Sequence, residues 1–256
     1  MPREWDATTY DALPLPHEQW GKRTLGRLAA SGPRREARVL DLGCGTGRDT
    51  AALLDLLPDG YVVAVDGSLR MLDRLRQRLA GRMDRVEAVH ADITHGLPLR
   101  EPVDAVVSVA TLHWIPDHAA LFGEIARVLR PGGTFVAECG GPGNIAHVSA
   151  AVDDVLGTRP AVWHFAGVAE TEQRLRDAGF TDIDVALAPD PARLAAGDQL
   201  LSYLAVVVLG GQLERLHEDE HEAFVRAVAE RLPEPVVDYV RLTITATRGR
   251  SGAPGV

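Results

Sequence analysis

The sequence predicts an α/β fold, in which a mostly parallel sheet carries helices on both faces. Short apolar runs alternate along the chain with longer stretches of helical periodicity. The runs at 62–66 and 103–109 have valine at several neighbouring positions, which is typical of parallel strands covered on both faces. A glycine-rich turn joins the first apolar run to the next helix, and such a turn lets a ligand lie against the main chain.

The composition is that of a globular protein with a sizeable core. The chain has 256 residues, 46% of them hydrophobic and 25% charged, enough for one large domain or a core domain with an insertion. The formal net charge of −9 argues against a nucleic-acid partner, because such binding relies on Lys and Arg to neutralise phosphates. We therefore expect a small-molecule substrate.

Targeting and redox features are sparse. No apolar run reaches the roughly 20 residues needed to cross a bilayer, and the start, with Trp5 and Tyr10, lacks a signal-peptide pattern. We expect a cytoplasmic protein that does not bind membranes. Cys44 and Cys139 are too few and too differently placed for a disulfide framework or a zinc site, so we expect reduced thiols and no metal.

Aromatic side chains are concentrated in residues 1–30, ahead of the first predicted strand. Two of the four tryptophans lie in the first 20 residues, and a helical pattern follows through Leu28. These rings are expected to cap an open end of the core. Tyr10, His17 and Trp20 are alternatively substrate-contacting residues of an N-terminal lid, which the family resemblance described below implies.

The glycine-rich turn lies within Val39–Gly47, between a predicted strand and a helix predicted by the spacing of Ala51, Leu54 and Leu57. Its glycines stand at alternate positions, Gly43, Gly45 and Gly47. The dinucleotide fingerprint requires a glycine where Arg48 stands, and no Gly-Lys-Ser/Thr follows as in a P-loop. The turn is expected to hold a cofactor other than a dinucleotide, with Asp66 at the end of the next strand.

Two further strands are expected at Val86–His90 and Val103–Val109, after a helix over Leu69–Leu79. Ligands of open α/β sheets lie beyond the carboxyl ends of the strands, which places His113 and Trp114 beside the substrate. His113 is expected to act as a general base or to orient an acceptor oxygen, or else to be a structural residue bonded to the N-terminal segment.

The next part of the chain is expected to supply a second wall of the substrate site. A helix over Leu121–Leu129 precedes a strand over Thr134–Ala137, and a helix over Asn144–Leu156 follows. An aromatic and basic cluster comes next, with Arg159, Trp163 and His164 as candidates. Arg159 would pair with a carboxylate or phosphate, or else be a solvated surface residue.

The last third predicts a helix over Glu170–Ala178, a strand over Asp182–Leu187 and a helical insertion over 189–232. Tyr203 in this insertion either faces the substrate or belongs to the core. In the last strand, Tyr239–Thr245, polar and apolar residues alternate, which suits a half-covered strand. Residues 249–256 are expected to form a flexible tail.

Three motifs carry a resemblance to a known family. Asp41 with the alternate glycines resembles motif I of class I S-adenosylmethionine-dependent methyltransferases. Asp66-Gly67-Ser68 with Met71 resembles the D-x-S-x-x-M motif of that family, and Arg127–Gly133 matches its R-x-L-x-P-G-G signature. The resemblance implies a Rossmann-like, seven-stranded sheet, S-adenosylmethionine as methyl donor and S-adenosylhomocysteine as product.

The resemblance also implies roles for individual residues. Asp66 would accept both ribose hydroxyls, and Asp92 would bond the adenine amino group while Ile93 packs on its ring, unless Asp92 is a loop residue capping the next turn. The expected cofactor-binding residues are Asp41, Gly43, Gly45, Gly47, Asp66, Gly67, Ser68, Asp92, Ile93, Ser108 and Ala110.

The chain is expected to form a single methyltransferase domain over 1–248, with an N-terminal lid (1–30), a cofactor-binding core (36–140) and a helical cap (189–232). Whether it is a monomer or a homodimer stays open.

The resemblance narrows further to a branch. Leu112–Trp114 and Glu138–Ile145, together with Trp5 and Tyr10, resemble the branch that includes trans-aconitate methyltransferases, although Cys139 replaces its usual aromatic residue. This implies O-methylation of a small carboxylic acid. Three alternatives stay open: C- or other heteroatom methylation of an anionic prenyl or polyketide intermediate, a non-catalytic scaffold that binds the cofactor, and a dehydrogenase, which the missing glycine disfavours.

Overall fold

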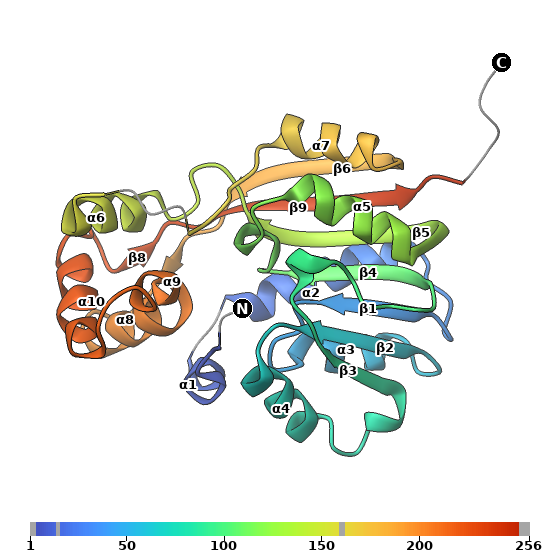
Figure 1. Cartoon of the computed structure of the whole chain (residues 1–256), viewed down its shortest axis with the longest axis horizontal. Coiled ribbons are helices and arrows are strands. Elements are labelled where there is room, and N and C mark those ends of the chain that lie inside the picture. Colours follow the sequence, from blue (N-terminus) through green and yellow to red (C-terminus); the bar gives the residue numbers. More distant parts are fainter. Residues whose placement is uncertain (1–3, 14–15, 159–161, 251–256) are drawn as a thin grey trace.

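The computed structural model describes residues 4–13, 16–158 and 162–250, so Arg159 and 251–256 of the predicted tail lie outside the described residues. A seven-stranded sheet forms the centre, in the order β3-β2-β1-β4-β5-β9-β6 (Figure 1). Its strands are β1 (Arg38–Leu42), β2 (Tyr61–Asp66), β3 (Val86–His90), β4 (Val103–Val109), β5 (Leu129–Gly140), β6 (Phe180–Pro189) and β9 (Val240–Arg248). The predicted α/β fold with seven strands is confirmed.

The directions of the strands determine which residues lie together at one edge of the sheet. The pairs β1–β2, β1–β4, β2–β3 and β4–β5 are parallel, whereas β9 is antiparallel to both β5 and β6. The first residues of β9 therefore lie at the same edge of the sheet as the last residues of β4 and β5; Arg241, for example, pairs with Gly140.

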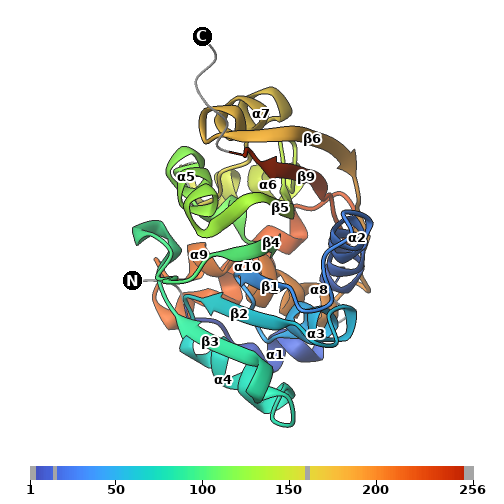
Figure 2. The same ribbon diagram turned by 90° about the vertical axis from the view of Figure 1, so that its right-hand side faces the viewer.

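Successive strand residues point to opposite faces of the sheet, so their apolar side chains form two layers of core, one on each face. On one face Val39 and Val62 pack with leucines of α2 (His17–Ala30), α3 (Arg48–Leu56) and α4 (Leu69–Arg78). On the other face Leu40 and Val63 pack with α5 (His118–Val128) and α7 (Val168–Asp177). Figure 2 shows α2 and α3 on one side of the sheet and α5 on the other. Burial on both faces explains the valine-rich strands.

A separate group of helices lies beyond the carboxyl ends of the strands (Figure 1). It contains α6 (Ala146–Leu156), α8 (Asp198–Tyr203), the π-helical turn Leu204–Val208, α9 (Gly210–Leu213) and α10 (His221–Glu230). A two-stranded sheet of β7 (Ala192–Arg193) and β8 (Val236–Val237) closes the insertion at its base. The sequence predicted α6 as a helix over Asn144–Leu156 and the other helices within 189–232, but not that they pack together in one apolar cluster.

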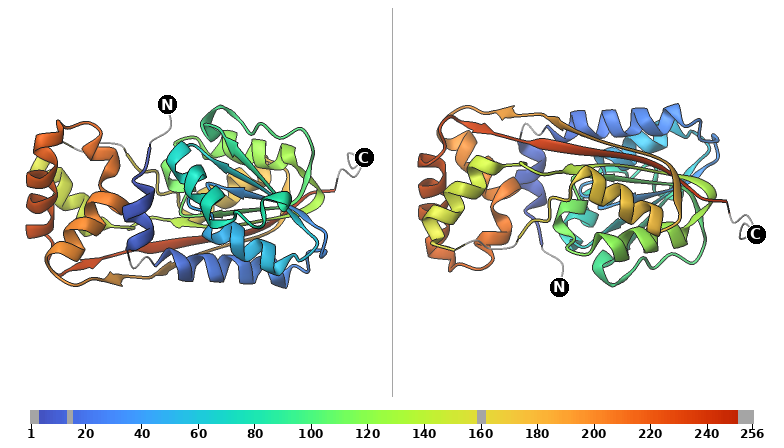
Figure 3. Two further views of the ribbon diagram at one scale, coloured as in Figure 1. Left: turned by 90° about the horizontal axis from the view of Figure 1, so that it is seen from below. Right: turned by 90° about the horizontal axis from the view of Figure 1, so that it is seen from above.

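The N-terminal segment lies between this helical group and the sheet, where Figure 3 shows α1 (Ala7–Ala12). Asp11 on α1 pairs with Arg48 at 3.1 Å, Arg74 at 2.9 Å and Arg78 at 2.7 Å, and accepts a hydrogen bond from Thr46 Oγ1 at 2.7 Å. α1 is thus tied to the glycine-rich turn and to α4.

Glu4 provides a second tie at the start of α4. Its carboxylate accepts hydrogen bonds from the Leu69 N–H at 2.9 Å, from the Arg70 N–H and from the Ser68 hydroxyl. These N–H groups have no partner within the helix, and the helix dipole favours a negative charge there. Although burial opposes it, these bonds lower the pKa of Glu4 below its ordinary value.

Two expectations need correction. β5 begins at Leu129, earlier than the predicted Thr134, because the Arg130–Gly133 turn is included in the strand. The half-covered face expected for the last strand is confirmed at Thr243 and Thr245, which are half-buried. It is wrong at Tyr239 and Arg241, which are buried because Trp20 of α2 packs on them. Within the described part of the chain, no helix has the length and apolar character of a membrane span.

Candidate active site

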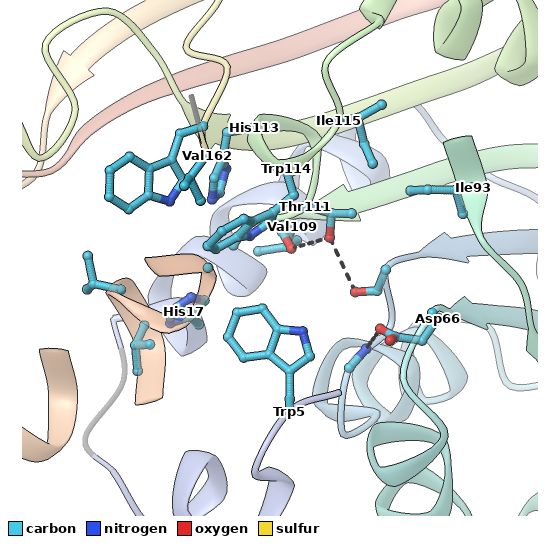
Figure 4. Close-up of a pocket in the computed structure, with 18 of the residues that line it drawn as sticks. Trp5, His17, Asp66, Ile93, Val109, Thr111, His113, Trp114, Ile115 and Val162 are labelled. Atoms are coloured by element: carbon cyan, nitrogen blue, oxygen red, sulfur yellow. Dashed lines mark hydrogen bonds between the residues drawn. The ribbon is translucent and has the colours of Figure 1, made fainter. Parts of the chain in front are cut away.

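A cavity of about 520 Å³ opens at the carboxyl ends of the parallel strands, between the sheet, the N-terminal segment and the helical group. Figure 4 shows Trp5, His17, Asp66, His113 and Trp114 around one space. The predicted site residues that line it are Tyr10, His17, Trp20, Gly43, Gly45, Gly67, Asp66, Asp92, Ile93, Ala110, His113, Trp114 and Trp163. Residues from both ends of the chain therefore meet the glycine-rich turn.

The glycines of the turn have different reasons to be glycine. A Cβ on Gly43, whose φ is +76°, would come within 2.0 Å of the Thr111 Oγ1. A Cβ on Gly47, which does not line the cavity, would come within 2.7 Å of Leu75 Cγ on α4. Gly43 thus permits close approach of the β4 tail, whereas Gly47 permits packing of α4 on the turn.

Asp66 is held in place at the floor of the cavity (Figure 4). One carboxylate oxygen accepts a hydrogen bond from the Gly45 N–H at 2.8 Å, and the other accepts one from the Ser68 N–H at 2.8 Å. Burial raises the pKa of Asp66 above its ordinary value, and these two bonds oppose the shift. Each oxygen keeps a lone pair for a vicinal diol, so the site fits a ribose.

The structure places Asp41 beneath the turn, not in the cavity. Its carboxyl accepts a hydrogen bond from Thr50 Oγ1 at 2.6 Å, which joins β1 to the first turn of α3. Burial, and then the charge of Asp49, raises the pKa of Asp41 to about 8. The motif acid is therefore a neutral group near pH 7 that supports the turn from below.

The raised pKa of Asp41 predicts that this residue makes the folded protein less stable as the pH rises. Between pH about 4 and about 8 the unfolded chain releases the Asp41 proton while the folded protein keeps it, so this group's contribution to the free energy of unfolding falls as pH rises. The free energy of unfolding of Asp41→Asn, measured with urea, should therefore rise relative to that of wild type by at least about 1 kcal/mol between pH 5 and pH 8. Asp73→Asn, at an exposed site on α4, is the control and should show a constant difference. A constant difference for Asp41→Asn as well would contradict the prediction.

Two serines expected at the cofactor are structural. Ser68 is the N-cap of α4 and its hydroxyl accepts a hydrogen bond from the Met71 N–H. The hydroxyl of Ser108 donates to the Leu42 carbonyl at 2.8 Å, so it links β4 to β1. Neither residue lines the cavity.

Asp92 lines the cavity and also caps the following turn. Its Oδ1 accepts hydrogen bonds from the Thr94 N–H at 3.0 Å and from the Thr94 hydroxyl at 2.6 Å. Its Oδ2 lies 3.2 Å from His95 Nδ1. Burial raises the pKa of Asp92, but these bonds outweigh it and keep the pKa below its ordinary value. An anionic acceptor thus sits beside the apolar side chain of Ile93, which suits adenine.

His113 is buried in the cavity wall after β4. Its Nδ1 accepts a hydrogen bond from the Gly140 N–H at 3.2 Å. Burial, and then the charges of Arg241, His17 and His118, hold the pKa of His113 well below its usual value. The ring is therefore neutral, and because Nδ1 accepts, the proton resides on Nε2. His113 offers an N–H donor and no free basic nitrogen, which argues against the predicted general base.

Aromatic rings form the rest of the wall. Trp5 packs edge-on against Trp114 with centroids 5.6 Å apart, and Trp163 stacks on Phe165 at 6.1 Å. His164 does not line the cavity, because its ring turns toward His118 and Arg174. Tyr203 lies behind the wall, where its hydroxyl is 2.7 Å from that of Tyr239, a residue that does line the cavity.

The backbone is strained at two points of this wall. Ala110 and Ile145 have φ values of 56° and 50°, a region that non-glycine residues seldom adopt and β-branched ones least of all. Both residues line the cavity, and strain of this kind concentrates at functional sites. A π-helical turn supplies Val207 and Val208 to the same cavity.

Several cavity residues were not predicted from the sequence, among them Asn144, Tyr239 and Arg241. Arg241 has 2% of its surface exposed, and its guanidinium lies 3.7 Å from the centroid of Trp20. The only signal for it was that it is the one charged residue of the predicted last strand, Tyr239–Thr245, in which the alternation assigned it to a polar face.

The comparisons with known proteins agree with this geometry. A family model described as a methyltransferase domain matches residues 39–133. The trans-aconitate 2-methyltransferase of Azoarcus sp. (strain BH72) is 34% identical over 204 residues, which cover 75% of this chain and 76% of that protein. The malonyl-[acyl-carrier protein] O-methyltransferase of Geobacter sulfurreducens is 34% identical over 185 residues, covering 70% of this chain and 68% of that protein.

Among solved structures, the phosphoethanolamine N-methyltransferase 2 of Haemonchus contortus shares the fold, with a TM-score of 0.61 and 20% identity. The match covers 90% of this chain and 53% of that chain. The chain belongs to the class I S-adenosylmethionine-dependent methyltransferases, in the branch that contains the trans-aconitate 2-methyltransferases.

Proposed function

We propose that this methyltransferase transfers a methyl group to a carboxylate oxygen of a small organic acid. The observation that carries the proposal is the hydrogen bond from the Gly140 N–H to Nδ1 of His113, a residue that lines the cavity, because this bond leaves the proton of a neutral ring on Nε2. A carboxylate is already a nucleophile and needs no base, whereas a neutral hydroxyl, amine or carbon acceptor must lose a proton. The trans-aconitate and malonyl-[acyl-carrier protein] O-methyltransferases named above support this class of acceptor.

The donor is proposed to lie along the lower half of the cavity. Asp66 would accept the ribose hydroxyls, Asp92 and Ile93 would hold the adenine, and the backbone from Gly43 to Gly45 would carry the methionine part. The donor supplies an electrophilic sulfonium methyl. Transfer of that methyl to a carboxylate oxygen would break the C–S bond as the C–O bond forms, would give an ester and a neutral thioether, and would need no proton transfer to a residue of this chain.

The task of the protein is then positioning in a dry site. The N-terminal segment is proposed to act as a lid, because Asp11 ties it to Thr46 in the glycine-rich turn and Glu4 ties it to the start of α4. The helical group is proposed to be the cap of the acceptor side. His113 would donate from Nε2 to the acceptor carboxylate and fix its orientation.

The role of His113 predicts a specific pattern of variants. His113→Ala should lower kcat/KM by about 10- to 100-fold, because one hydrogen bond to a charged acceptor is lost. Glutamine can donate a hydrogen bond but cannot serve as a base at neutral pH. His113→Gln should therefore recover part of this loss in a steady-state assay; no recovery at all in a folded variant would contradict the donor role.

The function itself is tested with labelled S-adenosylmethionine and a panel of mono-, di- and tricarboxylic acids, trans-aconitate among them, together with prenyl and polyketide intermediates. We expect a methylated acid in the mass spectrum that mild base hydrolyses back to the starting acid. Asp66→Ala is the inactive control. A base-stable product would instead indicate C- or N-methylation, and donor binding with no product from the whole panel would favour the scaffold.

A further inference from the structure

We infer that Arg241 selects the acceptor, by holding an anionic group of that molecule which does not itself react. The inference rests on the proposed function and names a residue for it. Arg241 lies on β9, lines the cavity and pairs in register with Gly140, whose N–H fixes the ring of His113. It is thus a cation built into the wall next to the proposed hydrogen-bond donor.

The guanidinium of Arg241 is buried but poorly satisfied. Nη2 donates to the Glu138 carbonyl at 3.3 Å, and this is its one hydrogen bond to the described residues. Nε is buried without a hydrogen-bond partner there, and it lies 3.7 Å from the Glu138 carboxylate, which is too far for one. Burial lowers the pKa of Arg241, against the attraction of neighbouring acids. A buried cation with so few hydrogen bonds destabilises the protein unless a ligand supplies the missing hydrogen-bond acceptors and negative charge.

The side chain is also fixed in one orientation. Its guanidinium lies over the indole of Trp20 at 3.7 Å, and the Trp20 Nε1–H donates to Asp190 at 2.7 Å. An arginine stacked in this way presents a planar fork of donors, the geometry that matches a carboxylate with two parallel hydrogen bonds.

The neighbouring charges do not cancel. Arg23, Arg27 and Arg241 surround Glu138 and Asp190, so three cations face two anions and one positive charge remains. Arg23 at 2.6 Å and Arg27 at 3.2 Å already take up the Glu138 oxygens, and Arg23 also pairs with Asp190 at 2.7 Å. The excess charge therefore resides on Arg241, which is the member of this cluster that lines the cavity.

The group held by Arg241 is a spectator, because a full bidentate ion pair would draw electron density from an attacking oxygen. A single N–H donor such as His113 leaves the reacting carboxylate a free lone pair. Binding energy from the unreacted part of a substrate serves to orient the reacting part. Arg241 thus favours acids with a second anionic group over monocarboxylates of the same size.

The test uses Arg241→Gln and Arg241→Lys, with Arg226→Gln, an exposed arginine paired to Glu222 on α10, as the matched control. Trans-aconitate is titrated by calorimetry into each protein saturated with S-adenosylhomocysteine, and S-adenosylhomocysteine is titrated alone. Arg241→Gln should weaken trans-aconitate binding by about 30-fold or more and Arg241→Lys by about tenfold, since lysine keeps the charge but loses the fork. Affinity for S-adenosylhomocysteine should stay within about twofold, and Tm should not fall, since the variant removes an underpaired buried charge.

Three results would overturn the inference. Equal trans-aconitate affinity in wild type and Arg241→Gln would make the residue structural. Loss of S-adenosylhomocysteine affinity alone would assign Arg241 to the amino-acid end of the donor. Failure of wild type saturated with S-adenosylhomocysteine to bind trans-aconitate would remove the anion site. A polycarboxylate that binds through Arg241 but is never methylated would contradict the proposed function and leave this inference standing.

Discussion

Replacing Asp66 with alanine is expected to weaken the binding of S-adenosylmethionine and S-adenosylhomocysteine by about 100-fold or more. Two hydrogen bonds from ribose hydroxyls to a buried carboxylate are lost, each worth about 1.5 to 3 kcal/mol, and each factor of ten corresponds to about 1.4 kcal/mol. Asp66→Asn keeps one acceptor oxygen, so its affinity for the donor should lie between that of wild type and that of Asp66→Ala. Isothermal calorimetry with S-adenosylhomocysteine measures the change directly.

The control for Asp66 is Asp73→Ala, an exposed carboxylate on the neighbouring helix α4 that pairs with Arg76. It should bind the donor like wild type. Because Asp66 also accepts hydrogen bonds from Gly45 and Ser68, circular dichroism and Tm show whether the variant is folded. Unchanged affinity in a folded Asp66→Ala protein would mean that the ribose lies elsewhere.

The second large effect is on stability, at Glu138. This carboxylate is fully buried and neutralises Arg23 and Arg27, with Arg241 close by. Glu138→Ala removes the counter-ion of the half-buried Arg27 and the nearest carboxylate of the buried Arg241, which costs about 3 kcal/mol and lowers Tm by roughly 6 to 12 °C. We take the lower end of the range for a broken buried pair, because the Arg23 side chain is 42% exposed and keeps Asp190.

Glu222→Gln provides the matched control, since it breaks the exposed Glu222–Arg226 pair and should change the free energy of unfolding by no more than about 0.5 kcal/mol. The effect of Glu138→Ala should shrink in an Arg241→Gln background, because one unpaired cation is then absent. Equal losses in both backgrounds would show that Glu138 and Arg241 do not interact.

The half of the cavity proposed for the donor could be anticipated because its residues are close together in the chain. Glycines at fixed spacing and an acid at the end of the next strand place Gly43, Gly45 and Asp66 at one edge of the sheet whatever packs around them. The same motif could not distinguish Asp41, which points beneath the turn to Thr50. A strand residue and its neighbour face opposite sides, and the sequence does not say which side holds the ligand.

The acceptor half could not be anticipated in the same way. Alternation in the last strand correctly groups Tyr239 with Arg241 on one face, but it carries no information on what covers that face. Trp20 covers Arg241 from a helix more than 200 residues earlier in the chain. For His113 the position was predicted, but its protonation depends on a hydrogen bond from Gly140, which only the folded chain brings near.

The antiparallel course of β9 has a consequence for how this enzyme could acquire new substrates. Residues 39–133, which the family model matches, contain the proposed donor site, whereas Tyr10, Trp20, Trp163 and Arg241 reach the cavity from outside that range. Substitutions outside residues 39–133 can therefore change which acceptor binds while the residues of the proposed donor site stay the same. Exchanging the segments that flank residues 39–133 between two members of the branch is therefore a way to transfer the acceptor preference of one enzyme to the other.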